Sequence, residues 1–158
     1  MNEADIKRIV ENTVASARAR RKKIDLSSAN ALADATLAEA KRQGVRAVVC
    51  VSDEAGNPKV IKCMDDSYIA SYDIALNKAF TSVALKMSTS DLKPLAQPGG
   101  SLYGIQFTNG GRIVIFGGGE TLTAPDGSIV GGIGVSGGTE DQDTYLSSFG
   151  KRYFETKL

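Results

Sequence analysis

Apolar side chains in the first part of the chain recur at the spacing of two amphipathic helices. The first stripe comprises Ile6, Ile9, Val10, Val14 and Ala17. The second comprises Leu32, Ala33, Leu37 and Ala40, with Thr36 inside it. Positions three and four apart share one helical face, so each stripe can pack on a core. Asp25, Ser27 and Ser28 are capping residues for the second helix, and Gly44 is placed to end it.

The middle of the chain predicts a hairpin, a long helix and a long loop. Residues 45–52 and 60–64 are β-branched runs that flank a cluster of turn formers. A helix capped by residues 65–67 follows, with an apolar stripe made of Ile69, Tyr72, Leu76, Ala79, Phe80 and Val83. Residues 88–111 are rich in Pro, Gly, Ser and Thr and predict a loop with one short turn near 91–95. Loops of this length are usually functional or covered by a partner.

The last part predicts three short strands and a closing helix. Strand-like runs at 112–116, 120–123 and 128–136 are separated by a glycine triplet and a Pro-Asp-Gly turn. Thr139 and Gln142 form a capping box for the helix. Its inward side chains are expected to be Tyr145, Leu146, Phe149, Tyr153 and Phe154. The element order predicts a mixed α+β fold with an antiparallel sheet between helices.

Length and charge narrow the class of protein. The 158 residues fit one domain spanning 1–158, and 42% are hydrophobic. The net charge of +1 points to neither nucleic acid nor an anionic membrane. The basic run at 18–23 contains no interleaved aromatic residue, so we expect a solvated helix end. No apolar run approaches the roughly 20 residues of a membrane span, and the amino terminus lacks a signal-peptide core. We therefore expect a cytoplasmic protein.

The sequence contains no histidine, which limits the available chemistry. Histidine is the most common general base at neutral pH, the most common metal ligand and the usual axial ligand of haem. Without it, Ser136 cannot belong to a Ser-His nucleophile, and two cysteines are too few for a four-thiolate zinc site. The hairpin places Cys50 opposite Ile61 and Cys63 opposite Val48. We expect both thiols to be buried, reduced and structural.

Glycines in the last predicted strand indicate close packing. Residues 132–137 match the dinucleotide fingerprint, but they lie inside a strand and no second parallel strand follows, so we reject that interpretation. Glycine inside a strand usually marks close approach of another backbone or of a ligand. The partner of Gly131, Gly132 and Gly134 could be a helix of the same chain, such as the alanine-rich second helix. A flat ligand or a second subunit remains an alternative.

Lys78 lies in the middle of the third predicted helix. We expect a snorkelling lysine that pairs with a carboxylate. A buried lysine acting as a catalytic amine or an anion clamp is the alternative.

The carboxyl-terminal half resembles a known family. The sequence IALNKAFTSVAL is followed by a glycine-rich pattern whose most specific positions are Gly118, Gly119, Asp126, Gly127, Gly131, Gly134, Val135, Ser136, Gly137, Gln142 and Asp143. Residues 25–155 resemble the GlcG/HbpS family, which includes the carboxyl-terminal domain of PduO-type corrinoid adenosyltransferases. The resemblance implies a profilin-like α/β/α fold with a five-stranded antiparallel sheet. It also implies homo-oligomers, haem binding and, in some members, haem degradation or a place in diol or glycolate utilisation operons.

Three functions from different classes stay open. The first is a module that binds haem or another tetrapyrrole without histidine ligation. The second is an accessory protein that binds other proteins of the same operon, and the third is an enzyme acting on a small metabolite, which we favour least. Candidate cofactor-binding residues are Met64, Tyr68, Tyr72, Lys78, Gly118, Gly119, Gly134 and Ser136.

Overall fold

The computed structural model describes the backbone of residues 1–20 and 23–158 and the side chains of 1–15 and 23–158. The predicted basic run at 18–23 therefore lies outside the described side chains, except for Lys23, whose Nζ lies 2.7 Å from Glu54 Oε1. The helices are α1 (Glu3–Arg20), α2 (Leu26–Arg42), α3 (Ala70–Leu85), α4 (Thr89–Leu95) and α5 (Glu140–Lys157). The strands are β1 (Val48–Asp53), β2 (Pro58–Cys63), β3 (Gly119–Thr123) and β4 (Ile129–Ser136).

One antiparallel sheet with the strand order β2-β1-β4-β3 forms the centre of the fold. β1 pairs with both β2 and β4, and β4 pairs with β3. The predicted register of the hairpin is confirmed, because Cys50 lies opposite Ile61 and Val48 lies opposite Cys63. Since neighbouring residues of a strand face opposite sides, this register decides which β1 side chains enter which core.

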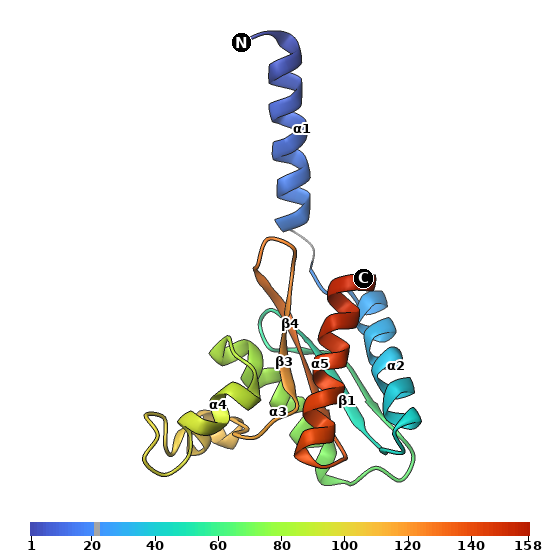
Figure 1. Ribbon diagram of the computed structural model, residues 1–158, viewed down its shortest axis with the longest axis vertical. Coiled ribbons are helices and arrows are strands. Elements are labelled where there is room, and N and C mark those ends of the chain that lie inside the picture. Colours follow the sequence, from blue (N-terminus) through green and yellow to red (C-terminus); the bar gives the residue numbers. More distant parts are fainter. Residues whose placement is uncertain (21–22) are drawn as a thin grey trace.

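Helices cover both faces of the sheet, as predicted (Figure 1). α2 and α5 pack on one face, where the larger core contains Leu32, Val49, Ile133 and Leu146. α3 covers the other face, where Ala75 and Ala79 meet Val48 and Cys50. The small side chains of Ala75 and Ala79 let α3 lie close to the strands.

The predicted strand at 112–116 does not form, so the sheet among the described residues has four strands instead of the expected five. The backbone of this segment bonds to α3 instead of to a strand. Thr81 Oγ1 donates to the carbonyl oxygen of Arg112 at 3.2 Å and accepts from the Val114 N–H at 3.0 Å. β-branched composition predicted an extended segment, but its hydrogen-bond partner is a helical side chain.

The close approach predicted for the strand glycines is confirmed within the chain, with α3 rather than α2 as the partner of Gly132 and Gly134, whereas Gly131 lies against Ser52 of β1 and Ile24. A Cβ atom added to Gly134 would lie 2.6 Å from the backbone nitrogen of Ala79, and one on Gly132 would lie 2.7 Å from the Ala79 carbonyl oxygen. The backbone of α3 therefore rests directly on β4, and a side chain at either glycine would separate the two layers.

The predicted amino-terminal caps of α2 and α5 are confirmed, whereas that of α3 is not. Asp25 and Ser28 form a capping box at α2, and Thr139 and Gln142 form one at α5. The predicted cap of α3 is wrong: the helix begins later, and Ile69 at its N-cap makes no side-chain cap bond. Asp66 has a φ of 60°, so the chain turns away there instead of entering the helix.

The two cysteines occupy different environments, which corrects the expectation that both are buried. Cys50 is fully enclosed beneath α3, and burial raises the pKa of its thiol to about 12. Cys63 is exposed and is the last residue of the edge strand β2. Both thiols are free in the structure.

α1 extends away from the rest of the molecule (Figure 1). Asn2 Oδ1 accepts a hydrogen bond from the Asp5 N–H at 2.8 Å and so caps its first turn. None of the helices, within the part of the chain that the structure describes, combines the length and apolar content needed to cross a bilayer.

Replacing Gly134 with Val is expected to lower the free energy of unfolding by at least roughly 1–3 kcal/mol, because the new side chain would collide with the backbone of α3. Urea denaturation measures this loss. Lys59→Val places the same side chain at an exposed position of β2 and should change stability by less than about 0.5 kcal/mol. Equal effects of the two substitutions would contradict the close-packing explanation.

Thiol titration of the native protein is expected to detect one reactive cysteine, and titration in denaturant two. Cys63 is exposed, whereas Cys50 is enclosed and its raised pKa keeps it protonated at neutral pH. A Cys63→Ser variant should show no fast-reacting thiol in the native state. Rapid reaction of Cys50 in that variant would show that the α3 layer opens.

Candidate functional site

Three adjoining hollows lie where α2 ends and where α3 and α5 begin. The largest, which we call the α2–β2 groove, has a volume of about 650 Å³. It is lined by Lys41, Gly44, Val45, Arg46, Cys63, Met64, Asp65 and Asp66. Its walls are the end of α2 on one side and the segment following β2 on the other. The volume falls within the roughly 300–1,000 Å³ typical of cofactor pockets.

Two smaller hollows continue from the groove along the same end of the sheet. One of about 290 Å³ shares residues 44–46 and Asp66 with the groove and adds Tyr68. The other, of about 250 Å³, shares Tyr68 with it and reaches Ser136. Tyr68 therefore stands between them, and the three hollows form one continuous depressed surface.

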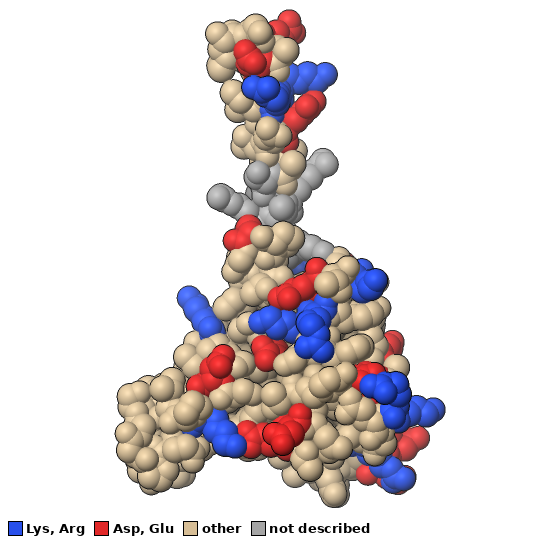
Figure 2. All heavy atoms as spheres, in the orientation of Figure 1, with Lys and Arg blue, Asp and Glu red and all other residues tan. Residues whose placement is uncertain are grey.

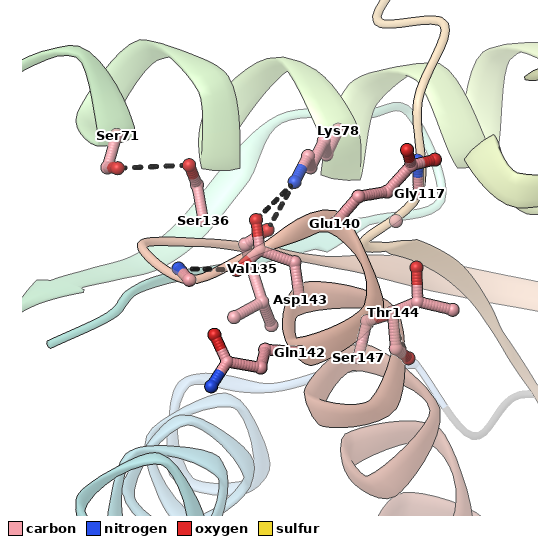
Figure 3. A network of polar contacts seen from close by, with 12 residues as sticks. Ser71, Lys78, Gly117, Val135, Ser136, Glu140, Gln142, Asp143, Thr144 and Ser147 are labelled. Carbon is pink, nitrogen blue, oxygen red and sulfur yellow. Dashed lines mark hydrogen bonds and ion pairs between the residues drawn. The ribbon is translucent and has the colours of Figure 1, made fainter. Parts of the chain in front are cut away.

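A buried ion pair lies behind this surface and joins three elements (Figure 3). Lys78 Nζ of α3 donates to Asp143 Oδ2 of α5 and to the Val135 carbonyl oxygen of β4, each at 2.8 Å. The two side chains are 0% and 5% exposed. The predicted carboxylate pairing is confirmed, but Lys78 is enclosed rather than snorkelling. As a catalytic amine it would be out of reach of a substrate.

Burial and pairing act against each other on these two groups. Desolvation lowers the pKa of Lys78, and the charge of Asp143 opposes that shift. Desolvation likewise raises the pKa of Asp143, and Lys78 opposes it. The second carboxylate oxygen of Asp143 accepts from the Gly138 N–H at 2.9 Å. The ion pair therefore fixes the turn at 137–138, which lines both smaller hollows.

Three of the predicted cofactor-binding glycines pack around α3 and do not line the hollows. A Cβ atom on Gly118 would lie 2.6 Å from Lys78 Nζ, and one on Gly119 would lie 2.7 Å from the methyl group of Thr89. Gly134 lies against α3 in the same way. In the structure these glycines leave room for the helix and for the buried lysine.

The smallest hollow has a hydroxyl pair in its wall (Figure 3). Ser136 Oγ donates to Ser71 Oγ at 3.0 Å, and both side chains are buried. Glu140 at its rim accepts from the Gly117 N–H at 2.9 Å and from Lys93 Nζ at 2.6 Å. The carboxylates facing this hollow are therefore already partnered.

The predicted ligand candidates differ in accessibility. Tyr68 is 73% exposed and lines two hollows, whereas Tyr72 is 46% exposed and lines none of the three. Met64 lines the groove, but its Sδ accepts the Ala47 N–H at 3.3 Å and its side chain packs on the main core. Met64 is thus less free to bind a ligand than Tyr68.

Cys63 is a groove residue that sequence reasoning missed. It lines the α2–β2 groove and is exposed there. Its apolar strand context suggested burial. Its place at the end of the hairpin's second strand, which becomes the sheet edge, was the signal that could have indicated exposure.

Both charge signs surround the groove. Lys41 and Arg46 supply cations, and Arg46 Nη1 lies 2.9 Å from Asp66 Oδ2 in an exposed ion pair. Exposed pairs of this kind contribute little stability and exchange partners easily. An anionic group of a ligand could therefore take the place of Asp66 beside Arg46.

Comparison of the sequence with known protein families assigns the chain to one of them. Residues 24–150 match a family model described as haem degrading protein HbpS-like. The chain belongs to the HbpS-like family. It is similar to an uncharacterized 15.0 kDa protein of the dhaT-dhaS intergenic region of Citrobacter freundii, with 44% identity over 78% of this chain and 87% of that protein. The corrinoid adenosyltransferase PduO of Salmonella typhimurium is 39% identical over 71% of this chain, which spans only 33% of that enzyme.

Solved structures of similar proteins share the fold. The crystal structure of protein ORFY from Klebsiella pneumoniae has a TM-score of 0.82 and 40% identity, with 85% of this chain and 92% of that chain covered. The crystal structure of a PduOC:heme complex has a TM-score of 0.78 and 33% identity, with 82% and 94% covered. The match supports the mixed α+β architecture, with four strands in this chain.

Replacing Lys78 with Met is expected to lower the free energy of unfolding by about 3–5 kcal/mol, because Asp143 would be left buried without its partner. The double variant Lys78→Met/Asp143→Asn removes that charge while keeping an acceptor for the Gly138 N–H. It should be more stable than Lys78→Met alone, which a double-mutant cycle in urea would reveal. A loss below about 1 kcal/mol in Lys78→Met would contradict the central role of the pair.

Proposed function

We propose that this HbpS-like chain is a binding module for haem or a closely related tetrapyrrole, and that the α2–β2 groove holds it. The observation that carries the proposal is an exposed thiol, Cys63, in a groove of about 650 Å³ that also presents cations. A family relative is crystallised as a haem complex, and the family is described as haem degrading. Together these support a cofactor-binding role.

The residues of the groove fit the chemistry of such a ligand. Val45 and Met64 supply apolar surface for a flat macrocycle, and Lys41 and Arg46 can pair with its carboxylates. Haem, when bound, supplies an iron centre for redox chemistry or oxygen binding. The protein would orient the macrocycle, hold its carboxylates and provide a side chain that could ligate the iron.

Cys63 and Tyr68 are the residues that we propose would ligate the iron, in that order. A cysteine thiolate and a tyrosine phenolate are both established haem ligands, whereas imidazole is not available in this sequence. Cys63 lines the large groove itself, and Tyr68 stands at the next hollow along the same surface. Met64 ranks lower because its sulfur already accepts a hydrogen bond.

Titration of the protein with hemin should give saturable binding and a high-spin or thiolate-like spectrum. Cys63→Ser should change the spectrum and lower the affinity about tenfold or more, because the thiolate that would ligate the iron is lost. Tyr68→Phe tests the second proposed ligand in the same way. Its matched control is Tyr103→Phe, which alters an exposed tyrosine on the loop after α4 and should leave the spectrum and the affinity unchanged. A tight six-coordinate low-spin complex would contradict this ligand assignment.

A second candidate function is an accessory protein that binds other proteins of a metabolic operon and no tetrapyrrole. The resemblance to a protein encoded between dhaT and dhaS favours it. Hemin titration separates these two candidates, since absence of saturable binding would exclude the tetrapyrrole module and favour the accessory role over it.

We propose further that the chain forms at least a homodimer through the start of α3. Tyr68, Ile69 and Tyr72 form an exposed apolar cluster there, and Ile69 is 97% exposed. Light scattering at micromolar concentration should show an oligomer, with a smaller mass for Ile69→Gln. Leu26→Gln, at an exposed position of α2, should leave the mass unchanged. A monomeric wild-type chain would exclude this assembly.

A further inference from the structure

α1 has an apolar face that nothing in the described structure covers. Its side chains Ile6, Ile9, Val10 and Val14 are each between 45% and 53% exposed. The helix stands away from the sheet and its layers (Figure 1). The chain enters the main core only at Ile24, which is 3% exposed. The apolar face of α1 therefore contributes nothing to the core of its own domain.

α1 also lies outside the part of the chain that defines the family. The family match begins at residue 24, after the helix ends. Both layers of the core are built from residues 24 onwards. In proteins most of the stability of a helix comes from packing of its apolar face, and the apolar face of α1 is exposed. A role for α1 must therefore come from contact with another molecule.

The width of the apolar face indicates the shape of that contact. At about 100° per residue, the arc from Ile9 through Ile6 to Val14 spans about 140° of the helix. A two-helix coiled coil uses a narrower seam of two positions per heptad. An arc this wide is buried when the helix lies in a groove between two other helices.

Glu3 argues against a parallel bundle of copies of the same helix as the occupant. Glu3 projects within the arc, between the directions of Val10 and Val14. In a parallel bundle of identical helices, the Glu3 side chains would meet at one level and repel. A groove that instead carries a cation near this end would accept the acidic first turn formed by Glu3 and Asp5.

The same charges argue against a membrane surface. Helices that lie on membranes combine a basic polar face with aromatic or leucine anchors. The described side chains of α1 carry acids and bases together (Figure 2). Residues 1–15 include no aromatic residue. A protein groove fits this composition better.

We propose that α1 is a docking helix that inserts into an apolar groove between helices of another protein, with a cationic group beside Glu3. The side chains at Ile6 and Val10 are the anchors, and Ile9 and Val14 contact the two walls. This role is independent of the tetrapyrrole groove, so removing α1 should leave hemin binding unchanged.

Site-specific photo-crosslinking in cells that express the full chain tests the proposal. A photoreactive side chain at Val10 should crosslink to one heterologous protein, and the same group at Arg8, on the opposite face, should give about tenfold less product. Crosslinks to a second copy of this chain or to lipid would overturn the proposal. So would equal yields from both positions, or no crosslink from either.

Binding of the purified, crosslink-identified protein to the full chain then tests the anchors. Ile6→Gln/Val10→Gln keeps good helix formers but removes the apolar anchors, so affinity should fall about tenfold or more. Ala4→Gln/Ala15→Gln introduces the same residues on the opposite face and should change affinity less than about twofold. Glu3→Lys should weaken binding and reduce its dependence on salt. Equal affinity for the first variant and its control would overturn the proposal.

Discussion

The enclosed ammonium group of Lys78 is the interaction on which the rest of the domain depends. It ties α3 to β4 through the Val135 carbonyl and to α5 through Asp143. A buried charge is tolerated only when it is paired and hydrogen-bonded, so these three elements must keep their mutual positions. The glycines at 118 and 134 are consequences of the same arrangement, because one leaves room for the amine and the other for the backbone of its helix.

This fixed arrangement shapes one end of the domain into a binding surface. Asp143 holds the turn at 137–138, and that turn lines the hollows next to the α2–β2 groove. The groove itself lies at the sheet edge, where β2 has no further strand and Cys63 is left exposed. The buried ion pair and the turn at 137–138 thus hold the surface that lies next to Cys63. These packing residues support the proposed binding surface without contacting a ligand themselves.

Much of the fold could be predicted from local patterns, whereas the site depended on tertiary contacts. Periodicity and capping located α2 and α5, and β-branched runs with a turn gave the hairpin and its register. The segment at 112–116 was mistaken for a strand because Thr81, distant in sequence, takes its hydrogen bonds. Cys63 was mistaken for a core residue because its exposure follows from the position of β2 in the sheet. Family resemblance marked the important glycines, but their partner, α3, became visible only in three dimensions.

The most direct test of the central claim is alkylation of Cys63 in the native protein with and without saturating hemin. Because Cys63 lines the α2–β2 groove and Cys50 is enclosed, native alkylation reports on that groove alone. If the groove holds the macrocycle, one equivalent of hemin should slow the modification of Cys63 by about tenfold or more, whichever residue is the axial donor. An unchanged alkylation rate at saturating hemin would show that the tetrapyrrole binds elsewhere and would contradict the account.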